Sequence, residues 1–459
     1  MNTNQPLQVN IETMLAYYHD GQYVMAQNLA LSITKEFPNH NISWKILAEI
    51  YAHDGKMDMA LTSIQSAIRI NSKDAEAHNN MSSILFKLNL FDKAIRSSKK
   101  AIELKSDYAE AHNNLGITLQ KLNRFEQAEF RFKKAIALKP NFVKAHYNLG
   151  VTLQSLEKLE EAVISYKKVI ELKPIFFEAH YNLGIISQRL GKLEEAEVNY
   201  KKVIELKPNF EITYNNLGNT VKELGKLVDA EMYYRKAIEL RPDNTLSKKN
   251  LDILLRENKL FSLLQTRKLQ NKKKLSDFNP YTSLGSTPLI LNREVEVELI
   301  SSLHKINSTN FSNVKGGPLF GTGSTTANYQ LFENNLSILS NVKKDLINIM
   351  EKAVKSDIYI MESFFNILSD GSGSVPHTHI GVFDKIKGLI KQKFSLVYYL
   401  SVGDQNCSKP GIFKLNDPDE EILPNNGMVI IIPADRKHSA VYNGKLDRVM
   451  IGVNFYSII

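Results

Sequence analysis

The sequence predicts a multidomain α plus β protein, in which an N-terminal α-solenoid precedes a β-rich jelly-roll or barrel domain with flanking helices. Three observations lead to this fold class. A 34-residue period runs through the first half of the chain, and 459 residues exceed what one hydrophobic core supports. The last part, about 170 residues, carries short apolar runs separated by turns. We expect repeats over 7–264, a basic linker over 265–285 and the β-rich domain over 286–459.

The repeats are recognised by small residues at fixed positions. Position 20 is alanine seven times, which lets two helices approach closely: Ala26, Ala60, Ala94, Ala128, Ala162, Ala196 and Ala230. Position 8 holds Gly116, Gly150, Gly184 and Gly218, for the same steric reason. Position 32 holds Pro140, Pro174, Pro208 and Pro242, which stop the second helix. The pattern resembles the tetratricopeptide repeat (TPR) family. This resemblance implies antiparallel helix pairs stacked into a right-handed superhelix with a concave face.

Two polar positions recur in the repeats. Histidine returns at position 4, as His78, His112, His146 and His180, and is replaced there by Trp44 and Tyr214. Because neighbouring repeats are about 10 Å apart, these rings cannot share a metal ion, and we interpret them as packing residues. Asparagine returns at position 6, as Asn80, Asn114, Asn148, Asn182, Asn216 and Asn250. The row resembles the asparagine ladder of the O-GlcNAc transferase repeats, which bind polypeptide. The amides either pair with an extended peptide or tie adjacent helices together.

Charge and cysteine content exclude several classes of protein. The net charge is +9, and the basic residues cluster only around Arg267, Lys268 and Lys272 to Lys274, without interleaved aromatic residues. We therefore expect no specific nucleic-acid binding. The single cysteine, Cys407, excludes a disulfide framework and fits a reducing compartment. No leader and no run of eighteen apolar residues is visible, so we expect a cytoplasmic protein without a membrane segment.

The second half of the chain alternates between two helices and several strands. A strand over 288–292 precedes helices over 294–306 and 336–354. Strands are then expected over 359–368, 394–402, 412–415, 428–432 and 449–456. The glycine-rich stretch from Gly316 to Thr325 lacks the lysine of a phosphate-binding loop, and we interpret it as a flexible loop at the mouth of the barrel.

Four residues near the end of the chain have the spacing of a metal and keto-acid site. His377 and His379 are two residues apart, so on a strand both side chains point to the same side. His438 follows an apolar strand and a proline turn that can bring it opposite this pair. Arg448 begins the next strand, and its planar fork suits the distal carboxylate of a keto acid. Tyr398 or Tyr399 could donate a further hydrogen bond.

These residues resemble the 2-oxoglutarate and iron(II)-dependent dioxygenases, in a branch with a His-x-His motif. The ordered landmarks are His377-Thr-His379, Ser395 to Leu400, Asp417-Pro418, Pro433 to His438 and Arg448 to Asn454. The resemblance implies a double-stranded β-helix that binds Fe(II), 2-oxoglutarate and O₂. His377, His379 and His438 would hold the metal, whereas Arg448 and a tyrosine would hold the keto acid.

The motif departs from the wider superfamily at one ligand. That superfamily combines two histidines with one carboxylate, and this chain has His379 at the carboxylate position. Asp384 is the alternative ligand, although it would require a bulged strand. Our hypothesis is an oxygenase that hydroxylates a polypeptide recruited by the TPR superhelix. The competing hypothesis is a TPR protein-binding scaffold with a catalytically silent metal-binding jelly-roll domain.

Overall fold

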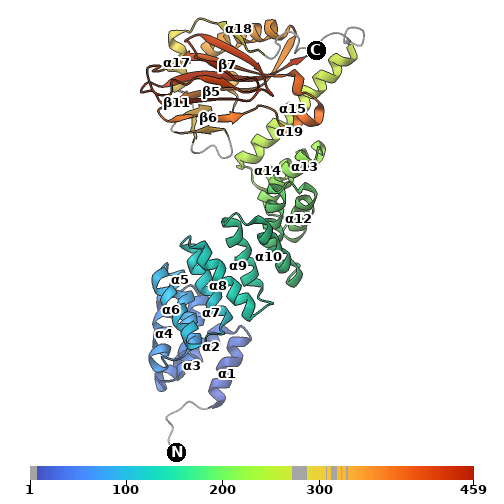
Figure 1. Ribbon diagram of the computed structural model, residues 1–459. Coiled ribbons are helices and arrows are strands. Elements are labelled where there is room, and N and C mark those ends of the chain that lie inside the picture. The colour runs from blue at the N-terminus through green and yellow to red at the C-terminus, as the bar shows by residue number, and fades with distance from the viewer. Residues whose placement is uncertain are drawn as a thin grey trace, which may run out of the picture. The chain divides into compact units, whose positions relative to one another are not determined.

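The computed structural model describes residues 8–270, 287–306, 308–311, 318–321, 323–326 and 329–458 (Figure 1). By its internal contacts the chain divides into two compact units, Met1–Thr213 and Tyr214–Ile459. No helix among the described residues combines the length and the apolar composition needed to cross a lipid bilayer.

The first unit consists of antiparallel helix pairs, as the 34-residue period predicts. Its helices are Gln8–His19 (α1), Tyr23–Glu36 (α2), Asn41–His53 (α3), Met57–Ile70 (α4), Ala75–Lys87 (α5), Phe91–Leu104 (α6), Ala109–Lys121 (α7), Phe125–Leu138 (α8), Val143–Ser155 (α9), Leu159–Leu172 (α10), Phe177–Arg189 (α11) and Leu193–Leu206 (α12). Helix α13, Glu211–Glu223, begins in this unit and ends in the next. The second helix of a pair ends two residues before the proline, for example at Leu138 before Pro140.

The repeated small residues lie where two helices meet. All seven alanines at position 20 are completely buried. Each glycine at position 8 faces an aromatic ring of its partner helix. A Cβ added to Gly150 would lie 2.7 Å from the Tyr166 ring, closer than van der Waals contact allows. The steric explanation of both positions is thereby confirmed.

The recurring histidines are hydrogen-bond donors to the preceding turn. Nε2 of His78 lies 3.1 Å from the carbonyl oxygen of Ser72, and Nε2 of His146 lies 2.8 Å from that of Pro140. Trp44 Nε1 donates to Pro38 in the same way, at 2.8 Å. Where position 4 is histidine or tryptophan, its ring N–H thus bonds the preceding turn in addition to packing, whereas Tyr214 has no such ring N–H.

The second unit begins with the last repeat helices and continues into the β-rich domain. Helix α14 spans Leu227–Leu240, and α15 spans Thr245–Gln270. The predicted end of the repeats at residue 264 is therefore too early, because α15 continues six residues further into the expected linker. Residues 271–286 of that linker lie outside the described part of the chain.

The β-rich domain contains two antiparallel sheets. Its strands are Leu289–Asn292 (β1), Ser308–Asn310 (β2), Leu319–Phe320 (β3), Ser324–Thr326 (β4), Asp357–Leu368 (β5), Ser372–His377 (β6), Lys393–Ser401 (β7), Phe413–Leu415 (β8), Glu420–Ile422 (β9), Met428–Pro433 (β10), His438–Tyr442 (β11) and Arg448–Ile458 (β12). The larger sheet has the order β1-β10-β7-β12-β5-β4-β2, and the smaller has the order β3-β6-β11-β8-β9. The glycine-rich stretch is partly strand, because β3 pairs with β6 and β4 with β5.

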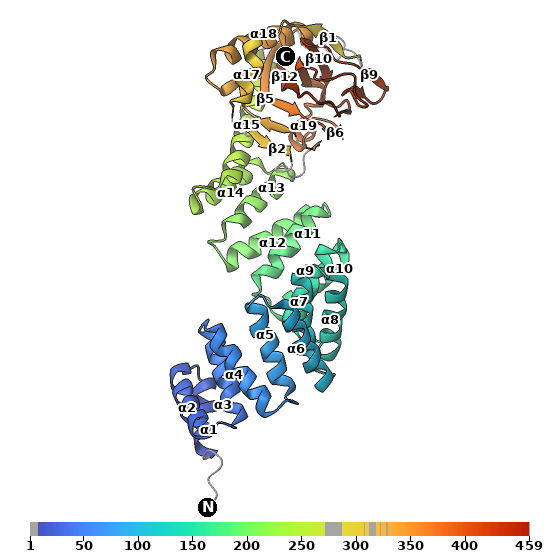
Figure 2. The same cartoon turned by 90° about the vertical axis from the view of Figure 1, so that its left-hand side faces the viewer.

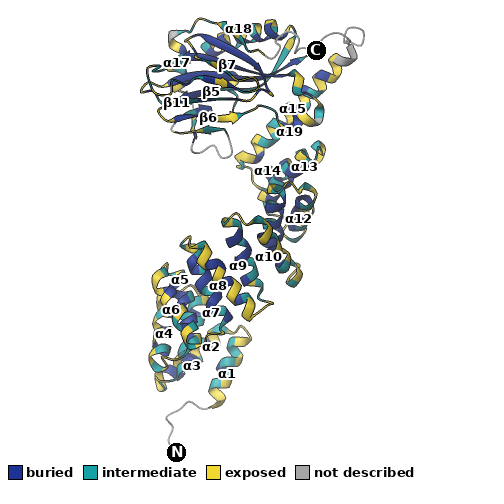
Figure 3. Cartoon of the chain, viewed as in Figure 1, coloured by how far each residue is buried: buried dark blue, intermediate teal, exposed yellow. Residues whose placement is uncertain are grey.

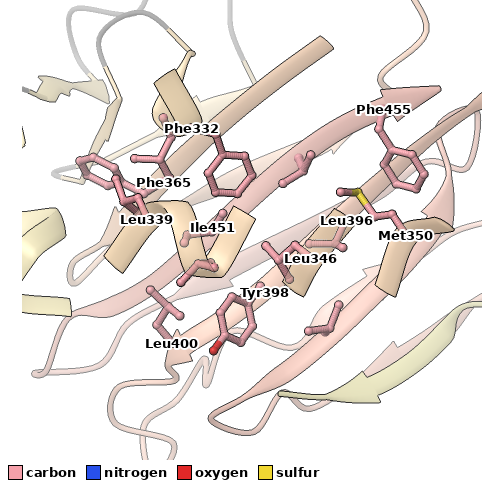
Figure 4. Packing of buried hydrophobic residues seen from close by; sticks show 14 of the residues in the cluster. Phe332, Leu339, Leu346, Met350, Phe365, Leu396, Tyr398, Leu400, Ile451 and Phe455 are labelled. Carbon is pink, nitrogen blue, oxygen red and sulfur yellow. The ribbon is translucent and has the colours of Figure 1, made fainter. Parts of the chain in front are cut away.

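Helices cover one face of the larger sheet. Helices α17, Val297–His304, and α18, Ser337–Val354, lie on the side of β5 that faces away from β6 (Figures 1 and 2). Leu346 and Met350 of α18 pack there against Leu396 and Ile451 of the sheet (Figure 4). Strand β7 is accordingly buried over most of its length, and β5 over its C-terminal half (Figure 3).

Helix α15 packs against the β-rich domain. Leu260 and Leu264 of this helix share an apolar cluster with Met361 of β5 and Tyr456 of β12. Arg256 also forms an ion pair with Glu333, with 2.8 Å between the charged atoms. The last repeat helix is therefore part of the same folded unit as the sheets.

Candidate metal centre and cavity

A cavity of about 220 Å³ lies between the two sheets. Strands β5, β7 and β12 of the larger sheet line one side, and β6 and β11 of the smaller sheet line the other. We call it the intersheet cavity and define it by six of its lining residues: Glu362, His377, His379, Tyr399, His438 and Asn454.

Strand register brings the three histidines together. His377 ends β6 and pairs directly with His438, the first residue of β11. His379 follows two residues after His377 and is held by a hydrogen bond from its backbone N–H to Ala434, at 2.8 Å. One ring nitrogen from each histidine lies within 4.8 Å of those of the other two. Among the described residues, this is the one group of three or more His, Cys, Asp or Glu side chains with such spacing.

The geometry of these rings suits a shared metal ion. Nε2 of His379 lies 3.2 Å from Nε2 of His438. Two nitrogen ligands at about 2.1 Å from one ion, separated by about 90–110°, would be about 3.0–3.4 Å apart. Nδ1 of His377 lies 2.9 Å from the Val375 carbonyl, and Nδ1 of His438 lies 3.1 Å from that of Arg436. A proton on each Nδ1 leaves Nε2 free to bind metal, which is the usual outer-shell arrangement.

His379 has a different outer contact, through Asn454 and Glu362. Asn454 Nδ2 lies 3.3 Å from His379 Nδ1 and donates to Glu362 Oε2 at 2.7 Å. The Oδ1 atom of Asn454 is buried and has no hydrogen-bond partner in the described structure. With Nδ2 donating, Nδ1 of His379 is the acceptor and Nε2 carries the proton. Metal binding at Nε2 would need the proton on Nδ1 and the amide rotated by 180°, and that rotation would replace the hydrogen bond to Glu362 by a contact between Oδ1 and Oε2 unless Glu362 were protonated. Neither Glu362 nor the contact of Asn454 was predicted as part of the site. The sequence contained one signal for this contact, because Asn454 ends the Arg448 to Asn454 landmark of the dioxygenase-like motif.

Burial keeps the three imidazoles neutral. It lowers the pKa of His377 and lowers that of His379 further, with an added contribution from the neighbouring His438. Burial, together with the nearby His377, lowers the pKa of His438 to about 4. All three rings are therefore uncharged at neutral pH, which is the protonation state that a metal ligand needs.

Asp384 is committed elsewhere, so the structure does not support it as the alternative ligand. Its carboxylate accepts hydrogen bonds from the backbone N–H of Gly381, from Lys393 Nζ at 2.9 Å and from the Tyr456 hydroxyl. It lies near the start of helix α19, Val382–Lys387, and is almost fully buried. His377 and His379 line the intersheet cavity, whereas Asp384 does not.

Arg448 and Tyr398 do not line the cavity, contrary to the prediction. Tyr398 points to the opposite face of β7, among the residues that pack against α18 (Figure 4). Its hydroxyl donates to the Glu294 carbonyl at 2.9 Å. Arg448 is fully buried, and its guanidinium donates to the carbonyl oxygens of Val402, Pro410 and Gly411.

Tyr399 does line the cavity and separates it from Arg448. The Arg448 guanidinium carbon lies 5.7 Å from the centre of the Tyr399 ring. The Tyr399 hydroxyl is buried without a hydrogen-bond partner in the described structure, and burial raises its pKa. A donor is thus available at this end of the cavity.

The asparagine ladder connects neighbouring repeats. Nδ2 of Asn80 donates to Glu49 at 2.7 Å, and Nδ2 of Asn114 donates to Asn79 at 2.8 Å. Asn148 and Asn182 donate in the same way to the repeat before them, and Asn250 donates to Asn215. These bonds favour the second interpretation of the ladder, in which the amides tie adjacent helices together.

Comparison with known proteins identifies the repeats. Residues 73–141, 143–176, 177–210 and 212–244 match family models described as tetratricopeptide repeat. Among solved structures, the chain is similar to YrrB, a TPR protein with an unusual peptide-binding site, at 27% identity and a TM-score of 0.37. That match covers 40% of this chain and 95% of YrrB.

Two further solved structures are similar to this chain. MamA is 25% identical with a TM-score of 0.33, and the match covers 35% of this chain and 95% of MamA. PilF of Pseudomonas aeruginosa is 18% identical with a TM-score of 0.42, and the match covers 45% of this chain and 95% of PilF. No curated protein matches the chain. On the family models, the helical part consists of tetratricopeptide repeats, a module of protein–protein interaction.

Proposed function

We propose that the C-terminal unit is an iron(II)- and 2-oxoglutarate-dependent oxygenase that acts on a polypeptide. The observation that carries this proposal is the group of three neutral histidines at the intersheet cavity. The sheet order supports the double-stranded β-helix fold, because β5, β7, β10 and β12 belong to one sheet and β6, β8, β9 and β11 to the other. This alternation is typical of an eight-stranded jelly roll.

Arg448 supports the binding of an anionic co-substrate. It is a fully buried cation, and no carboxylate of the described chain lies within 4.0 Å of it. A buried charge without a counter-charge is costly. Because Arg448 does not line the cavity and its donors face carbonyls, it would stabilise an anion there only through its positive potential across Tyr399, without a direct hydrogen bond. The unpaired Tyr399 hydroxyl can donate to that anion. When bound, iron(II) with 2-oxoglutarate would supply the redox chemistry that activates O₂.

The repeats supply the reason to propose a polypeptide substrate. They are a protein-interaction module, and they precede the cavity in the same chain. Glu362, Ser374 and Ser395 line the cavity and offer hydrogen-bond partners for a peptide side chain. We also propose a cytoplasmic location, for which the free thiol of Cys407 is the supporting observation.

One observation favours the second candidate, a protein-binding scaffold with a silent metal-binding domain. Nε, Nη1 and Nη2 of Arg448 each donate to a backbone carbonyl, and the metal group has no carboxylate. In that case the histidines would bind a metal that stabilises the fold without supporting turnover of 2-oxoglutarate.

Iron binding and succinate formation distinguish the two. The full chain is loaded with iron(II) without oxygen, and succinate formed from 2-oxoglutarate is measured after air is admitted. We expect His438→Ala to lower iron affinity and succinate formation at least about 100-fold, since one of three ligands is lost. The matched control is His304→Ala, an exposed histidine outside the cavity, which should leave both unchanged.

The keto-acid end of the cavity is tested with Tyr399→Phe. This change removes only the hydroxyl, and we expect it to raise the KM for 2-oxoglutarate about tenfold with iron binding intact. Iron bound by the wild type without any succinate would instead support the scaffold. Equal iron binding by wild type and His438→Ala would disprove the metal centre.

A further inference from the structure

A second hollow lies in the repeats, within the compact unit that does not contain the metal centre. It occupies about 370 Å³ between helices α6, α7 and α8. Its floor is formed by Ile95, Leu115 and Leu119, and its rim by Lys99, Arg124 and Arg131. We call this site the α6–α8 groove. The three floor residues are buried, whereas Lys99 and Arg124 are exposed to solvent.

The charges on its rim are not balanced. Lys99, Arg124 and Arg131 are positive, and Glu126 is the only carboxylate among the residues that line the groove. Within the described chain, none of these three cations has a carboxylate oxygen within 4.0 Å. The groove therefore has a net charge of +2 above an apolar floor.

At the next repeat interface, the two lysines that occupy the repeat positions of Lys99 and Arg124 form ion pairs. There Glu129 accepts ion pairs from Lys133 at 2.6 Å and from Lys158 at 2.8 Å, and Lys133 also faces Glu161 at 3.6 Å. One interface later, Lys167 pairs with Glu195 at 2.8 Å. Lysine at position 25 thus pairs with a glutamate of the following repeat at two interfaces, and Lys201 pairs with Glu197 of its own repeat at 2.7 Å.

At the α6–α8 groove, two residue differences remove the carboxylates that would form these ion pairs. Ile95 stands where the next repeat has Glu129, so Arg124 loses the partner that Lys158 has. Gln127 stands where the next repeat has Glu161, so Lys99 faces a neutral amide. A third cation, Arg131, takes the place of Ser165. Relative to the next repeat, the sequence differs at three positions of this groove, and each difference makes the groove more positive.

An exposed aromatic ring adjoins these cations. Phe130 lines the groove and is 52% exposed, which is unusual for a phenylalanine. The Arg131 guanidinium lies 5.2 Å from the centre of its ring, and Lys134 lies 5.8 Å from it. The ring holds Arg131 at the rim through a cation–π contact and extends the apolar surface of the floor.

We propose that the α6–α8 groove binds an acidic peptide segment of a partner protein, with an apolar side chain on the floor and carboxylates against the three cations. The charge imbalance calls for an anionic ligand, and the floor of three aliphatic residues calls for an apolar side chain beside it. A nucleic-acid strand fits less well, because Phe130 is the only aromatic residue in the lining, and bases stack on successive aromatic rings. This site is independent of the proposed oxygenase activity.

The test is fluorescence anisotropy of the full chain with a labelled peptide, Glu-Glu-Leu-Phe-Glu-Glu. Two control peptides replace either its four glutamates by glutamine or its Leu-Phe pair by Ser-Ser. We expect saturable binding of the first peptide, weakened at least about tenfold in each control. Lys99→Ala should also weaken binding at least about tenfold. Its matched control, Lys167→Ala, removes the same repeat position where the lysine is already paired, and should have no effect.

A second variant tests the groove without deleting a cation. Ile95→Glu with Gln127→Glu recreates the ion pairs of the next interface, so folding should be retained while peptide binding is lost. Thr62→Glu with Gln65→Glu adds the same charge to the exposed face of α4 and should preserve binding. The proposal is overturned if the acidic peptide does not bind at up to about 1 mM, if the glutamine peptide binds equally well, or if Lys99→Ala and Lys167→Ala weaken binding equally.

Discussion

At the scale of single residues, the candidate site depends on which nitrogen of each histidine is free. His377 and His438 donate from Nδ1 to backbone carbonyls, which leaves Nε2 of each ring without a proton. His379 instead depends on the orientation of the Asn454 amide, which Glu362 also contacts. Asn454 is therefore a positioning residue for the ring that occupies the usual carboxylate position.

The buried histidines predict a pH-dependent stability of the metal-free protein. Between the unfolded pKa of about 6.5 and the folded value of about 4 for His438, the unfolded state binds more protons. The stabilisation is complete above pH 6.5 and is lost as the pH falls toward 4. We expect His438 alone to lower the free energy of unfolding by about 2 kcal/mol between pH 7 and pH 5.

Urea unfolding checks this with a fluorophore on Cys407, the single cysteine, which lies in the C-terminal unit. The difference between pH 7 and pH 5 should be smaller by about 2 kcal/mol in His438→Gln than in the wild type. An identical pH dependence in both proteins would show that His438 is protonated in the folded state.

At the scale of elements, each repeat is closed by a matched pair at positions 8 and 24. Gly116, Gly150, Gly184 and Gly218 each face an aromatic ring at position 24. Two earlier repeats have smaller partners at these positions: Ala48 with Ile64, and Ser82 with Ser98, whose hydroxyl oxygens lie 2.6 Å apart. The glycine is needed only where the partner is aromatic.

Gly184→Ala should therefore destabilise the repeats by about 1–3 kcal/mol, because its Cβ would lie 2.7 Å from the buried Tyr200 ring. The second change Tyr200→Ile, which copies the Ala48 and Ile64 pair, should recover most of the loss. The two-step cycle is measured by urea unfolding followed by circular dichroism at 222 nm. Additive losses in the double variant would contradict the pairing.

At the scale of the whole molecule, the boundary between helical and β-rich parts does not follow the repeat pattern. Helix α15 belongs to the eighth repeat by sequence, yet Leu260 and Leu264 complete an apolar cluster on β5 and β12. Arg267 adds an ion pair to Asp357 at the start of β5. The C-terminal unit is therefore complete only with this helix.

Leu260→Ala is expected to destabilise the C-terminal unit by about 2–5 kcal/mol, because Leu260 is fully buried. Leu255→Ala on the same helix is the matched control, since Leu255 is 40% exposed and should have little effect. The Cys407 fluorophore should report the loss, whereas the fluorescence of Trp44, the single tryptophan, should report unchanged repeats. The prediction would be contradicted if Leu260→Ala shifted only the unfolding transition reported by Trp44.

The sequence by itself determined the helical repeats and most of the long strands. Helix ends, the close contacts at positions 8 and 20, and strands such as β7 and β10 follow from local periodicity and from the sizes of single residues. Each of these features can be recognised from the residues of a single repeat or a single strand. The shorter strands β2, β3, β4, β9 and β11 were missed, because a few residues carry too little periodic signal. The i, i+2 argument placed His377 and His379 on a strand, but β6 ends at His377.

Only the tertiary structure decided which side chains meet in the cavity. Tyr398 and Tyr399 point to opposite faces of β7, and the packing of α18 on one face leaves Tyr399 to the cavity. Arg448 is the first residue of β12, next to the register shift in the pairing with β7, and Gly411 leaves room for its guanidinium beside three carbonyls. The His377–His438 pair likewise depends on the register of β6 with β11. Register, bulges and the covering of a sheet face are long-range properties, so neighbouring residues in the sequence cannot specify them.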